Sequence, residues 1–311
     1  MNVNVIDGTN IYFICWSVLV GKKEDGLVTN LDHSELISLF FMKIKQFMGD
    51  KNNIVTFEGK NSRGWRQSIY PEYKAQRKNL HDDPNGEHFY WGLNEVQELL
   101  QYLPCKVIKA EDCEGDDCIF TITEGIMDKY PEATVKIVSS DEDLTQIALL
   151  HPDRIKVLHP IKKEYREVNP SIVLYKTVVG DGSDNIKFKK GIGPKTFEKM
   201  KEYQETWFKY VKPEEEKRLR EIQKIVDLRC YPKDLRQRIV DVYNSTPWNS
   251  PNIDKFRERY PDAYLCGFLV RLEMNYNLDM TENLGSLDTV KDYGNVEDIY
   301  PEYSKEQLLL G

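Results

Sequence analysis

Short apolar runs alternate with helical segments through the first 180 residues, and this alternation limits the possible folds more than any other feature. Runs of strand length lie at 2–7, 53–58, 106–109, 134–139 and 155–158. Segments with helical periodicity, such as 32–47, 93–103 and 114–129, separate most of them. Strands that alternate with helices form parallel βαβ units. The sequence therefore predicts an α/β fold with a mostly parallel, twisted sheet flanked by helices.

The second part of the chain has a different pattern. Strand signals nearly vanish after Pro170, and the segment 198–243 is helical and highly charged. We therefore expect an α/β domain at 1–180 and a helical domain at 181–311. The segment at about 60–92 combines poor periodicity with aromatic, basic and proline residues, which predicts an ordered basic arch outside the core.

The composition excludes several classes of protein. No apolar run is long enough to span a bilayer, and the N-terminus lacks the basic and apolar regions of a signal peptide. The six cysteines are scattered, and with the five histidines they complete no zinc-binding pattern. We expect a monomer in the cytoplasm, with reduced thiols and no membrane contact.

Charge is distributed unevenly along the chain, whose net charge is −8. The segment 60–78 carries six basic residues and one acid, whereas the segment 111–117 carries five acids and no base. The net negative charge alone argues against a general nucleic-acid-binding domain, which is usually basic. A basic segment and an acidic cluster in one chain instead indicate a polyanion that is held over bound cations.

Acidic residues follow the predicted strands at the points where the strands end. Together with two acids in the later turn VVGDGSDN, they are Asp7, Glu58, Glu114, Asp116, Asp117, Asp141, Asp143, Asp181 and Asp184. Each alone has an ordinary explanation, because aspartate caps helices and forms turns. Ligands bind beyond the carboxyl ends of the strands in an open α/β sheet, and so many carboxylates there would repel each other without cations. Their oxygen atoms favour Mg²⁺ or Mn²⁺ over zinc, and their number indicates two ions, as in phosphodiester cleavage.

The segment KKGIGPKTFEKM (189–200) has the pattern of a turn that enters a helix. Gly191 and Gly193 flank an apolar residue, and Pro194 suits the first helical position. Backbone N–H groups at such a helix start bind phosphate. The basic residues around the turn are Lys189, Lys190 and Lys195. An ordinary packing turn between two helices is the alternative.

In the segment 63–78, basic residues alternate with Trp65, Tyr70 and Tyr73. Aromatic rings stack on unpaired bases while lysine and arginine hold phosphates, so this segment would suit a nucleic acid strand. A solvated surface helix is the alternative interpretation.

The motifs DGTN, FE, EGDD, SSDED, GDGSDN and GIGPK occur in this order, and as a set they resemble the 5′-nuclease family. That family includes flap endonucleases, the 5′-nuclease domain of bacterial DNA polymerase I and phage 5′–3′ exonucleases. The chain length, the segment GWRQSIYPEYKAQRK and the helical C-terminal half are most similar to the ribonuclease H of T-even bacteriophages. The resemblance covers about residues 3–200. It implies a PIN-like 5′-nuclease fold, with a helix–hairpin–helix motif in the helical domain.

The resemblance implies two groups of metal ligands. The first ion would be held by Asp7, Glu58, Glu114 and Asp116. The second, more solvated ion would be held by Asp117, Asp141, Asp143 and Asp184, with Asp181 behind them. The chain departs from the family pattern at Glu58, where the family usually has aspartate, and at Gly115, which replaces alanine.

The resemblance also implies which residues contact DNA. Lys74 and Arg77 match catalytic positions near the scissile phosphate, and Tyr73 matches a DNA contact at the foot of the arch. The helix–hairpin–helix would grip the duplex backbone, with a monovalent cation, through Lys189, Lys190, Gly191, Gly193 and Lys195.

We therefore expect a metal-dependent 5′–3′ exonuclease and flap endonuclease with ribonuclease H activity, which removes RNA primers and 5′ flaps during DNA replication. Its substrates would be DNA and RNA–DNA hybrids at flaps, nicks and forks. The family implies a phage single-stranded-DNA-binding protein or a sliding clamp as partner, in the host cytoplasm if a phage encodes the chain. Two alternatives stay open. A PIN-type ribonuclease has no need of the arch or the hairpin turn, and a non-catalytic DNA-binding replication accessory protein predicts gaps in the carboxylate set.

Overall fold

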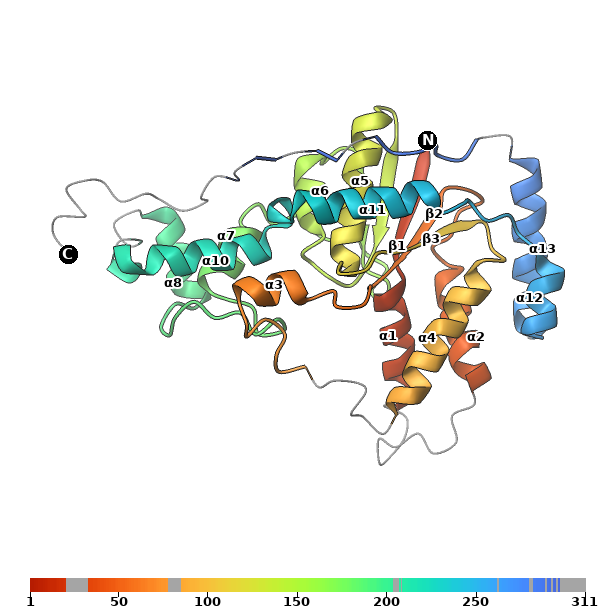
Figure 1. Ribbon diagram of the computed structural model, residues 1–311, viewed down its shortest axis with the longest axis horizontal. Helices are drawn as coiled ribbons and strands as arrows, with labels where there is room; N and C mark the ends of the chain where they lie inside the picture. The colour runs from red at the N-terminus through yellow and green to blue at the C-terminus, as the bar shows by residue number, and fades with distance from the viewer. Residues whose placement is uncertain are drawn as a thin grey trace. The chain divides into compact units, whose positions relative to one another are not determined.

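The computed structural model describes residues 1–20, 33–77, 85–203, 207, 209–261, 263–279, 282–288, 290–291, 293–294 and 296. Figure 1 shows the arrangement of its elements. In chain order they are β1 (Asn2–Asp7), α1 (Gly8–Val20), α2 (His33–Ile44), β2 (Asn53–Phe57), α3 (Gly64–Ile69), α4 (Gly86–Leu100), β3 (Cys105–Lys109), α5 (Gly115–Lys129), β4 (Thr134–Val138), α6 (Thr145–Leu150), β5 (Ile155–Leu158), α7 (Ile172–Val178), α8 (Pro194–Glu202), η2 (Pro213–Glu215), α10 (Glu216–Val226), η3 (Leu228–Cys230), α11 (Lys233–Ser245), α12 (Ile253–Arg259) and α13 (Ala263–Leu278). Lys78, at the end of the predicted basic segment, lies outside the described residues.

The five strands form one parallel sheet in the order β3-β2-β1-β4-β5. In the register of the central strand, Val5 lies opposite Ile54 on one side and Ile137 on the other. The predicted mostly parallel sheet is therefore confirmed. The strand order reverses between β1 and β4, and ligands of such sheets bind in the crevice beyond the carboxyl ends at this point.

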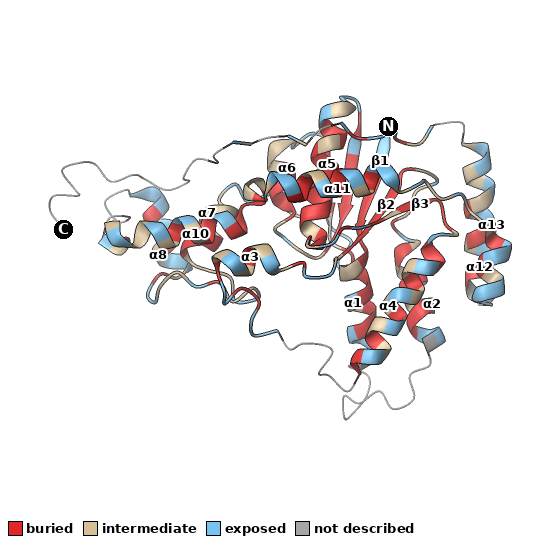
Figure 2. Cartoon of the chain, in the orientation of Figure 1, coloured by how far each residue is buried: buried red, intermediate tan, exposed pale blue. Residues whose placement is uncertain are grey.

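Helices cover both faces of the sheet, so its strands are apolar on both sides. Ile6 of β1 belongs to a core cluster that includes α1, α2, α4, α12 and α13. The neighbouring Val5 is fully buried and points to the opposite face, where α5 packs. Figure 2 shows how the buried residues gather on the strands and on the helix sides that face them.

A helix begins directly after β1, where the sequence predicted a turn. Asp7 accepts a hydrogen bond at 2.9 Å from the backbone N–H of Asn10, and so caps the first turn of α1. The segment 11–20 is apolar almost throughout, and its inward residues, including Ile11 and Trp16, are buried. A helix with so little polar periodicity gives a weak helical signal in the sequence.

The chain divides into two compact units, neither of which is continuous in sequence. Unit 1 contains Met1–Ser62, Lys78–Glu167 and Asp234–Lys291, and unit 2 contains Arg63–Arg77, Val168–Lys233 and Asp292–Gly311. In the described part of the chain, no helix is both long and apolar enough to cross a membrane. The predicted contiguous division at residue 180 stays a prediction.

Unit 2 has two small apolar cores of its own. One joins α7, α8 and α10 through residues such as Val178, Phe197 and Leu219. The other contains Tyr70 and Tyr73, which are only 2% and 3% exposed. This burial corrects the expectation that the arch segment lies outside the core, because the two rings pack inside unit 2.

Candidate metal centre and DNA-contact residues

Asp7 is the central acid of unit 1, at the carboxyl end of β1. Its carboxylate is only 6% exposed and accepts hydrogen bonds at 2.9 Å from the Asn10 backbone N–H and from the Ser139 hydroxyl. The pKa of Asp7 is raised to about 7, and burial is the main cause. The nearby charges of Asp141 and Glu58 also raise this pKa, whereas the two hydrogen bonds lower it. A bound cation would remove this cost, because it stabilises the ionised carboxylate.

The turn after β4 connects Asp7 to two more predicted ligands. The Ser139 hydroxyl that donates to Asp7 accepts a hydrogen bond at 3.1 Å from the backbone N–H of Asp141. The Asp141 carboxylate accepts another at 2.9 Å from the backbone N–H of Asp143. Asn10 braces the same turn through its side chain, which binds Ser140 by two hydrogen bonds. The two acids after β4 are therefore held in a fixed turn next to the end of β1.

Glu58 follows β2 at a point where the ends of two strands approach closely. A Cβ atom on Gly59 would lie 1.8 Å from the carbonyl oxygen of Ala110, so only glycine permits this approach. The Gly59 N–H donates to the carbonyl of Cys113 at 3.1 Å. This contact brings Glu58 to the segment that carries the EGDD motif.

The EGDD motif forms the N-terminus of α5. Glu114 and Asp117 make a capping box, in which each side chain accepts a hydrogen bond from the other residue's backbone N–H. The ordinary explanation of these two buried acids as caps is therefore correct, and ligation of a metal by them stays a prediction. Asp116 between them is partly exposed. A Cβ on Gly115 would lie 3.7 Å from Asp7 Oδ1 and 4.0 Å from Glu58 Cγ, so the alanine of the family pattern would fit here without strain.

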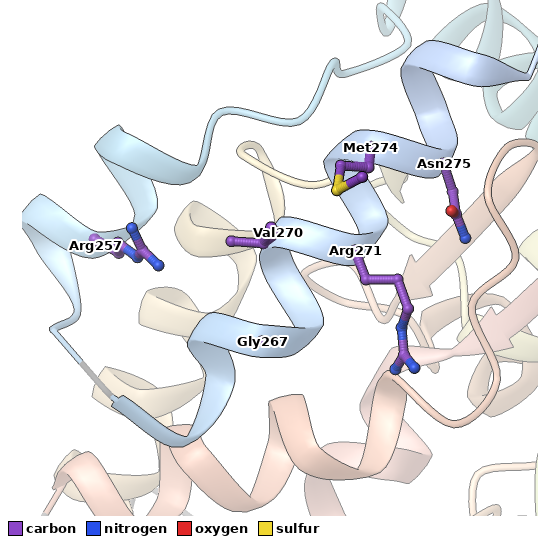
Figure 3. A pocket seen from close by; sticks show the side chains of 6 residues that line it. All are labelled: Arg257, Gly267, Val270, Arg271, Met274 and Asn275. Atoms are coloured by element: carbon purple, nitrogen blue, oxygen red, sulfur yellow. The ribbon is translucent and has the colours of Figure 1, made fainter.

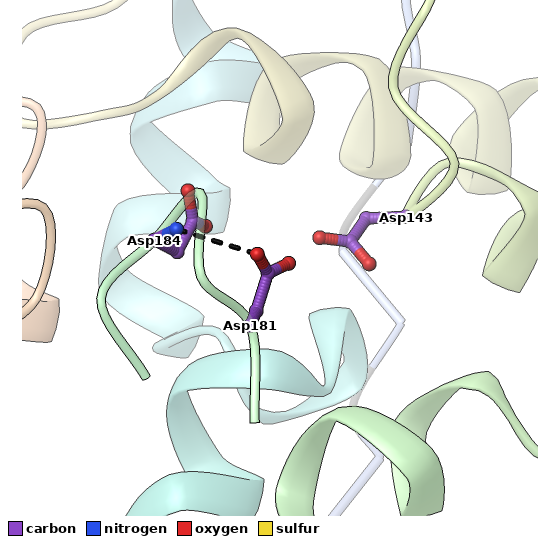
Figure 4. Close-up of side chains that lie close together, drawn as sticks. All are labelled: Asp143, Asp181 and Asp184. Carbon is purple, nitrogen blue, oxygen red and sulfur yellow. Dashed lines mark hydrogen bonds between the residues drawn. The ribbon is translucent and has the colours of Figure 1, made fainter. Parts of the chain in front are cut away.

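Asp181 and Asp184 lie in one turn of unit 2. The backbone N–H of Asp184 donates to Asp181 at 3.4 Å, which Figure 4 draws as a dashed line. Burial alone would raise the pKa of Asp181, but hydrogen bonds from Lys176 and Ser183 outweigh this effect and lower it to about 2. The Lys176 ammonium is 2.7 Å from Asp181 Oδ2. Asp181 is therefore ionised and already has a cationic partner, which fits its predicted place behind the directly ligating acids.

The segment that carries Lys74 and Arg77 is tied to this turn by hydrogen bonds to backbone carbonyls, which we call the clasp. The Lys74 backbone N–H donates to the carbonyl of Asp184 at 2.9 Å, and the Asn185 side chain donates to the carbonyl of Glu72 at 2.8 Å. Gln76 donates to the Ser183 carbonyl at 2.9 Å. Lys74 and Asn185 both have positive φ angles, of 53° and 58°, which are uncommon for residues other than glycine. The clasp holds both residues in this conformation.

Within the clasp, both predicted catalytic cations face Asp184. Arg77 makes an ion pair with Asp184 Oδ1 at 2.8 Å, and the Lys74 ammonium is 3.8 Å from Oδ2. Lys74 is only 6% exposed, and its ammonium lies 4.8 Å from the centre of the Tyr73 ring. The structure therefore brings together Lys74, Arg77 and Asp184, which the resemblance implied would act at one site.

The Tyr73 ring forms the floor beneath Lys74. Arg66 is buried beside this ring, contacts the rings of Trp65 and Tyr231 as well, and donates to the Ile225 carbonyl at 3.0 Å. The DNA contact of Tyr73 stays a prediction, and its ring, which is 3% exposed and supports Lys74, is not open to stacking on a base.

The glycine turn before α8 has the expected local geometry. Gly191 has a φ of +94°, Gly193 precedes the helix, and Pro194 is its first residue. Lys190 and Lys195 are exposed, as a phosphate contact requires. Lys189 differs, because its ammonium lies 2.8 Å from both carboxylate oxygens of Glu215. DNA binding by this turn, and its assignment as a helix–hairpin–helix, stay predictions.

Several residues of these arrangements were missed in the sequence. Ser139 and Asn185 stand inside recognisable motifs, SSDED and GDGSDN, so their positions carried a signal. Lys176 and Gln76 carried none, because a lysine in a helix and a glutamine in a polar loop are most often solvated.

Comparison with known proteins identifies the family. A model of the 5′–3′ exonuclease N-terminal, resolvase-like domain matches residues 2–177, which is more than half of the chain. The chain belongs to the 5′–3′ exonuclease family. The resemblance that the motif order predicted is thus confirmed.

Several curated proteins resemble this chain. The 5′–3′ exonuclease of Mycoplasmopsis pulmonis is 31% identical over 171 residues, which are 51% of this chain and 54% of that protein. Flap endonuclease Xni of Aeromonas hydrophila is 28% identical over 150 residues, 46% of this chain and 53% of that protein. The thermostable DNA polymerase I of Thermus caldophilus is 32% identical over 164 residues, 49% of this chain and 18% of the polymerase. The chain thus spans about half the length of the two nucleases that it matches.

Solved structures support the fold of a 5′–3′ exonuclease. The D15 protein of bacteriophage T5, crystallised with metal ions, superposes with a TM-score of 0.58 at 20% identity, over 88% of this chain and 100% of that chain. The same flap endonuclease in complex with DNA and metal ions gives a TM-score of 0.55 at 20% identity, with the same coverage. At this identity the likeness establishes the fold alone. That fold agrees with the parallel sheet flanked by helices and the further helices described above.

Proposed function

We propose that the protein is a divalent-metal-dependent 5′ nuclease that acts as a 5′–3′ exonuclease and flap endonuclease. Its substrates are DNA and RNA–DNA hybrids at flaps, nicks and forks, including the RNA primers of replication. The observation that carries the proposal is the buried Asp7 carboxylate, set among other acids at the strand-order reversal of the sheet. The family membership and the flap endonucleases among its relatives support the same function.

The residues at the sheet edge fit divalent metal ions. All candidate ligands are carboxylates, which suit Mg²⁺ or Mn²⁺. The raised pKa of Asp7 has burial as its main cause, and its acidic neighbours add to it, so a cation is the natural complement. Such ions, when bound, lower the pKa of an attacking water and neutralise charge on the phosphoryl oxygens. We assign the ions to Asp7, Glu58, Glu114, Asp116, Asp117, Asp141, Asp143 and Asp184, with Asp181 in a supporting position.

Lys74 and Arg77 provide the cationic part of the proposed site. Ion pairs with Asp184 orient both side chains before a substrate binds, and the Tyr73 ring also supports Lys74. Groups that are already oriented stabilise charge developing on the scissile phosphate without reorganisation. Both residues are therefore proposed to act on the transition state more than on substrate affinity.

The alternative of a non-catalytic accessory protein is not favoured, because the set of carboxylates has no gap and differs from the family pattern only at Glu58. Cleavage of four 5′-labelled substrates, namely a flap, a nick, a single strand and an RNA–DNA hybrid, tests the function. We expect Mg²⁺-dependent cleavage of the flap and of the hybrid, with 5′-phosphate products. Tight binding to all four without any cutting would support the accessory protein instead.

Two lysines near the glycine turn should respond differently to alanine. We expect Lys195→Ala to weaken binding of a long duplex about threefold to tenfold and to reduce the slope of log affinity against log salt by about one. We expect Lys189→Ala to leave that slope unchanged and to cost about 1 kcal/mol of unfolding free energy, because Lys189 pairs with Glu215. Fluorescence anisotropy in Ca²⁺ and thermal unfolding provide the two readings. Equal salt slopes for both variants and wild type would remove Lys195 from the DNA contact.

A further inference from the structure

Helix α13 is apolar on two opposite sides, and among the described residues only one of these sides is covered by other elements. Its inner residues Leu265 and Leu269 pack in the core of unit 1. The outer side exposes Val270, Met274 and Leu278 at 42%, 58% and 74%, spaced four residues apart on one face. Apolar side chains that gather on one exposed face mark interaction sites more often than apolar residues that are exposed singly. The outer stripe is therefore a surface that a partner would cover.

The stripe borders an open hollow of about 430 Å³ between α12 and α13. Figure 3 shows the residues that line it, which are Arg257, Gly267, Val270, Arg271, Met274 and Asn275. Gly267 leaves the floor open, since no described atom outside its own helix backbone lies within 4 Å of the position that its Cβ would occupy. The hollow therefore has room for an added side chain or a short segment of chain.

The hollow is basic, and its arginines have no acidic partners among the described residues. Neither Arg257 nor Arg271 makes an ion pair there, and the Nε of Arg257 is buried without a hydrogen-bond acceptor. The neighbouring Arg259 behaves differently, because it binds Glu95 at 2.6 Å. None of the described residues that line the hollow is a carboxylate. Its charge would thus be complemented by acidic groups from outside.

We propose that the outer face of α13, with the hollow beside α12, binds an acidic amphipathic segment of another protein. Aliphatic side chains of that segment would cover Val270 and Met274, and its carboxylates would pair with the two arginines. A nucleic acid would satisfy the arginines but leave the aliphatic stripe uncovered. A second copy of the chain in a two-fold dimer would place basic hollows against each other, which is unfavourable.

The test uses a fluorescein-labelled synthetic helical peptide as long as α13, with leucine at every third or fourth position and glutamate or alanine elsewhere. We expect the full-length protein to bind it, and added salt to weaken the binding. Met274→Ser and Arg271→Glu should each weaken it by at least about tenfold. Ile161→Ser, at a site that is 57% exposed, and Lys255→Glu, on α12 outside the hollow, are matched controls that should bind normally.

Three results would overturn the proposal. The first is absence of binding, or equal binding of a peptide with lysine in place of glutamate. The second is competition by a single-stranded oligonucleotide that Arg271→Glu abolishes, which would make the face a nucleic acid contact. The third is a wild-type dimer that Met274→Ser dissociates, measured by sedimentation. Cleavage of naked flap DNA should be unchanged in these variants, so the outcome is independent of the proposed nuclease function.

Discussion

We expect Asp7→Asn to lower the single-turnover rate of flap cleavage on the order of a thousandfold, which corresponds to about 4 kcal/mol of transition-state stabilisation. The substitution keeps the size of the side chain and removes the charge that would hold the metal ions. In metal-free buffer near pH 8, the same substitution should raise the melting temperature. A buried carboxylate beside other acids destabilises the folded state when it is ionised, and asparagine does not ionise.

The direction of the pH effect follows from the raised pKa of Asp7. The pKa is about 7 in the folded protein and 3.8 is its ordinary value, so between about pH 4 and 7 the folded state binds a proton that the unfolded chain has lost. Stability without metal should therefore fall as the pH rises through this window, by about 4 kcal/mol at most. Asp7→Asn should flatten that part of the pH profile. Mg²⁺ should stabilise wild type at high pH and have little effect on the variant.

Thermal unfolding between pH 5 and 8, in EDTA and in Mg²⁺, measures these effects. Asp153→Asn is the matched control, because Asp153 is exposed and lies in a turn outside the proposed site. The control should keep wild-type cleavage and a wild-type pH profile. If Asp7→Asn is less stable than wild type in EDTA at pH 8 and still cleaves, Asp7 is a structural cap and not a metal ligand.

Lys74→Ala has the second largest expected effect. We expect the single-turnover rate to fall about a hundredfold or more, while affinity for flap DNA in Ca²⁺ changes by less than about threefold. Lys74 is nearly buried over the Tyr73 ring and faces Asp184. Little of its side chain is therefore available to contact bound DNA. An interaction that matters mainly in the transition state lowers turnover and leaves binding intact.

Two further variants separate charge from packing at this position. Lys74→Met keeps most of the buried volume and removes the charge, so it should be as inactive as Lys74→Ala but more stable. Lys187→Ala removes an exposed lysine of the same unit and should cleave normally. A Lys74→Ala variant that binds weakly but turns over normally at saturating DNA would show that the segment docks substrate and has no catalytic role.

The sheet could be predicted from the sequence because buried parallel strands are short apolar runs. The acids that follow these runs could also be located, since the carboxyl ends of parallel strands meet at one edge. Helix α1 was missed because its apolar residues mask the helical period. The predicted bounds of the helix at 93–103 were also wrong, because α4 begins at Gly86 and ends at Leu100.

The division of the chain between the two units depends on contacts that have no sequence signal. The segment Asp234–Lys291 joins the α/β unit, where the buried Lys106 donates to the carbonyl of Tyr243 at 2.8 Å and lies 4.0 Å from its ring. A lysine in a strand gives no indication of such a partner. The burial of Tyr70 and Tyr73 was likewise hidden, because a segment of alternating aromatic and basic residues is equally typical of a nucleic acid surface.

The central claim is that the carboxylates at the sheet edge bind divalent ions that the nuclease requires. Its most direct test is the single-turnover rate of 5′-flap cleavage as a function of Mg²⁺ concentration at constant ionic strength, for wild type and Asp7→Asn. We predict that wild type is inactive in EDTA, that its rate rises with more than the first power of Mg²⁺ concentration at low Mg²⁺, and that Asp7→Asn stays near background at every concentration. Cleavage by wild type that persists in EDTA, or a metal titration that Asp7→Asn leaves unchanged, would contradict the claim.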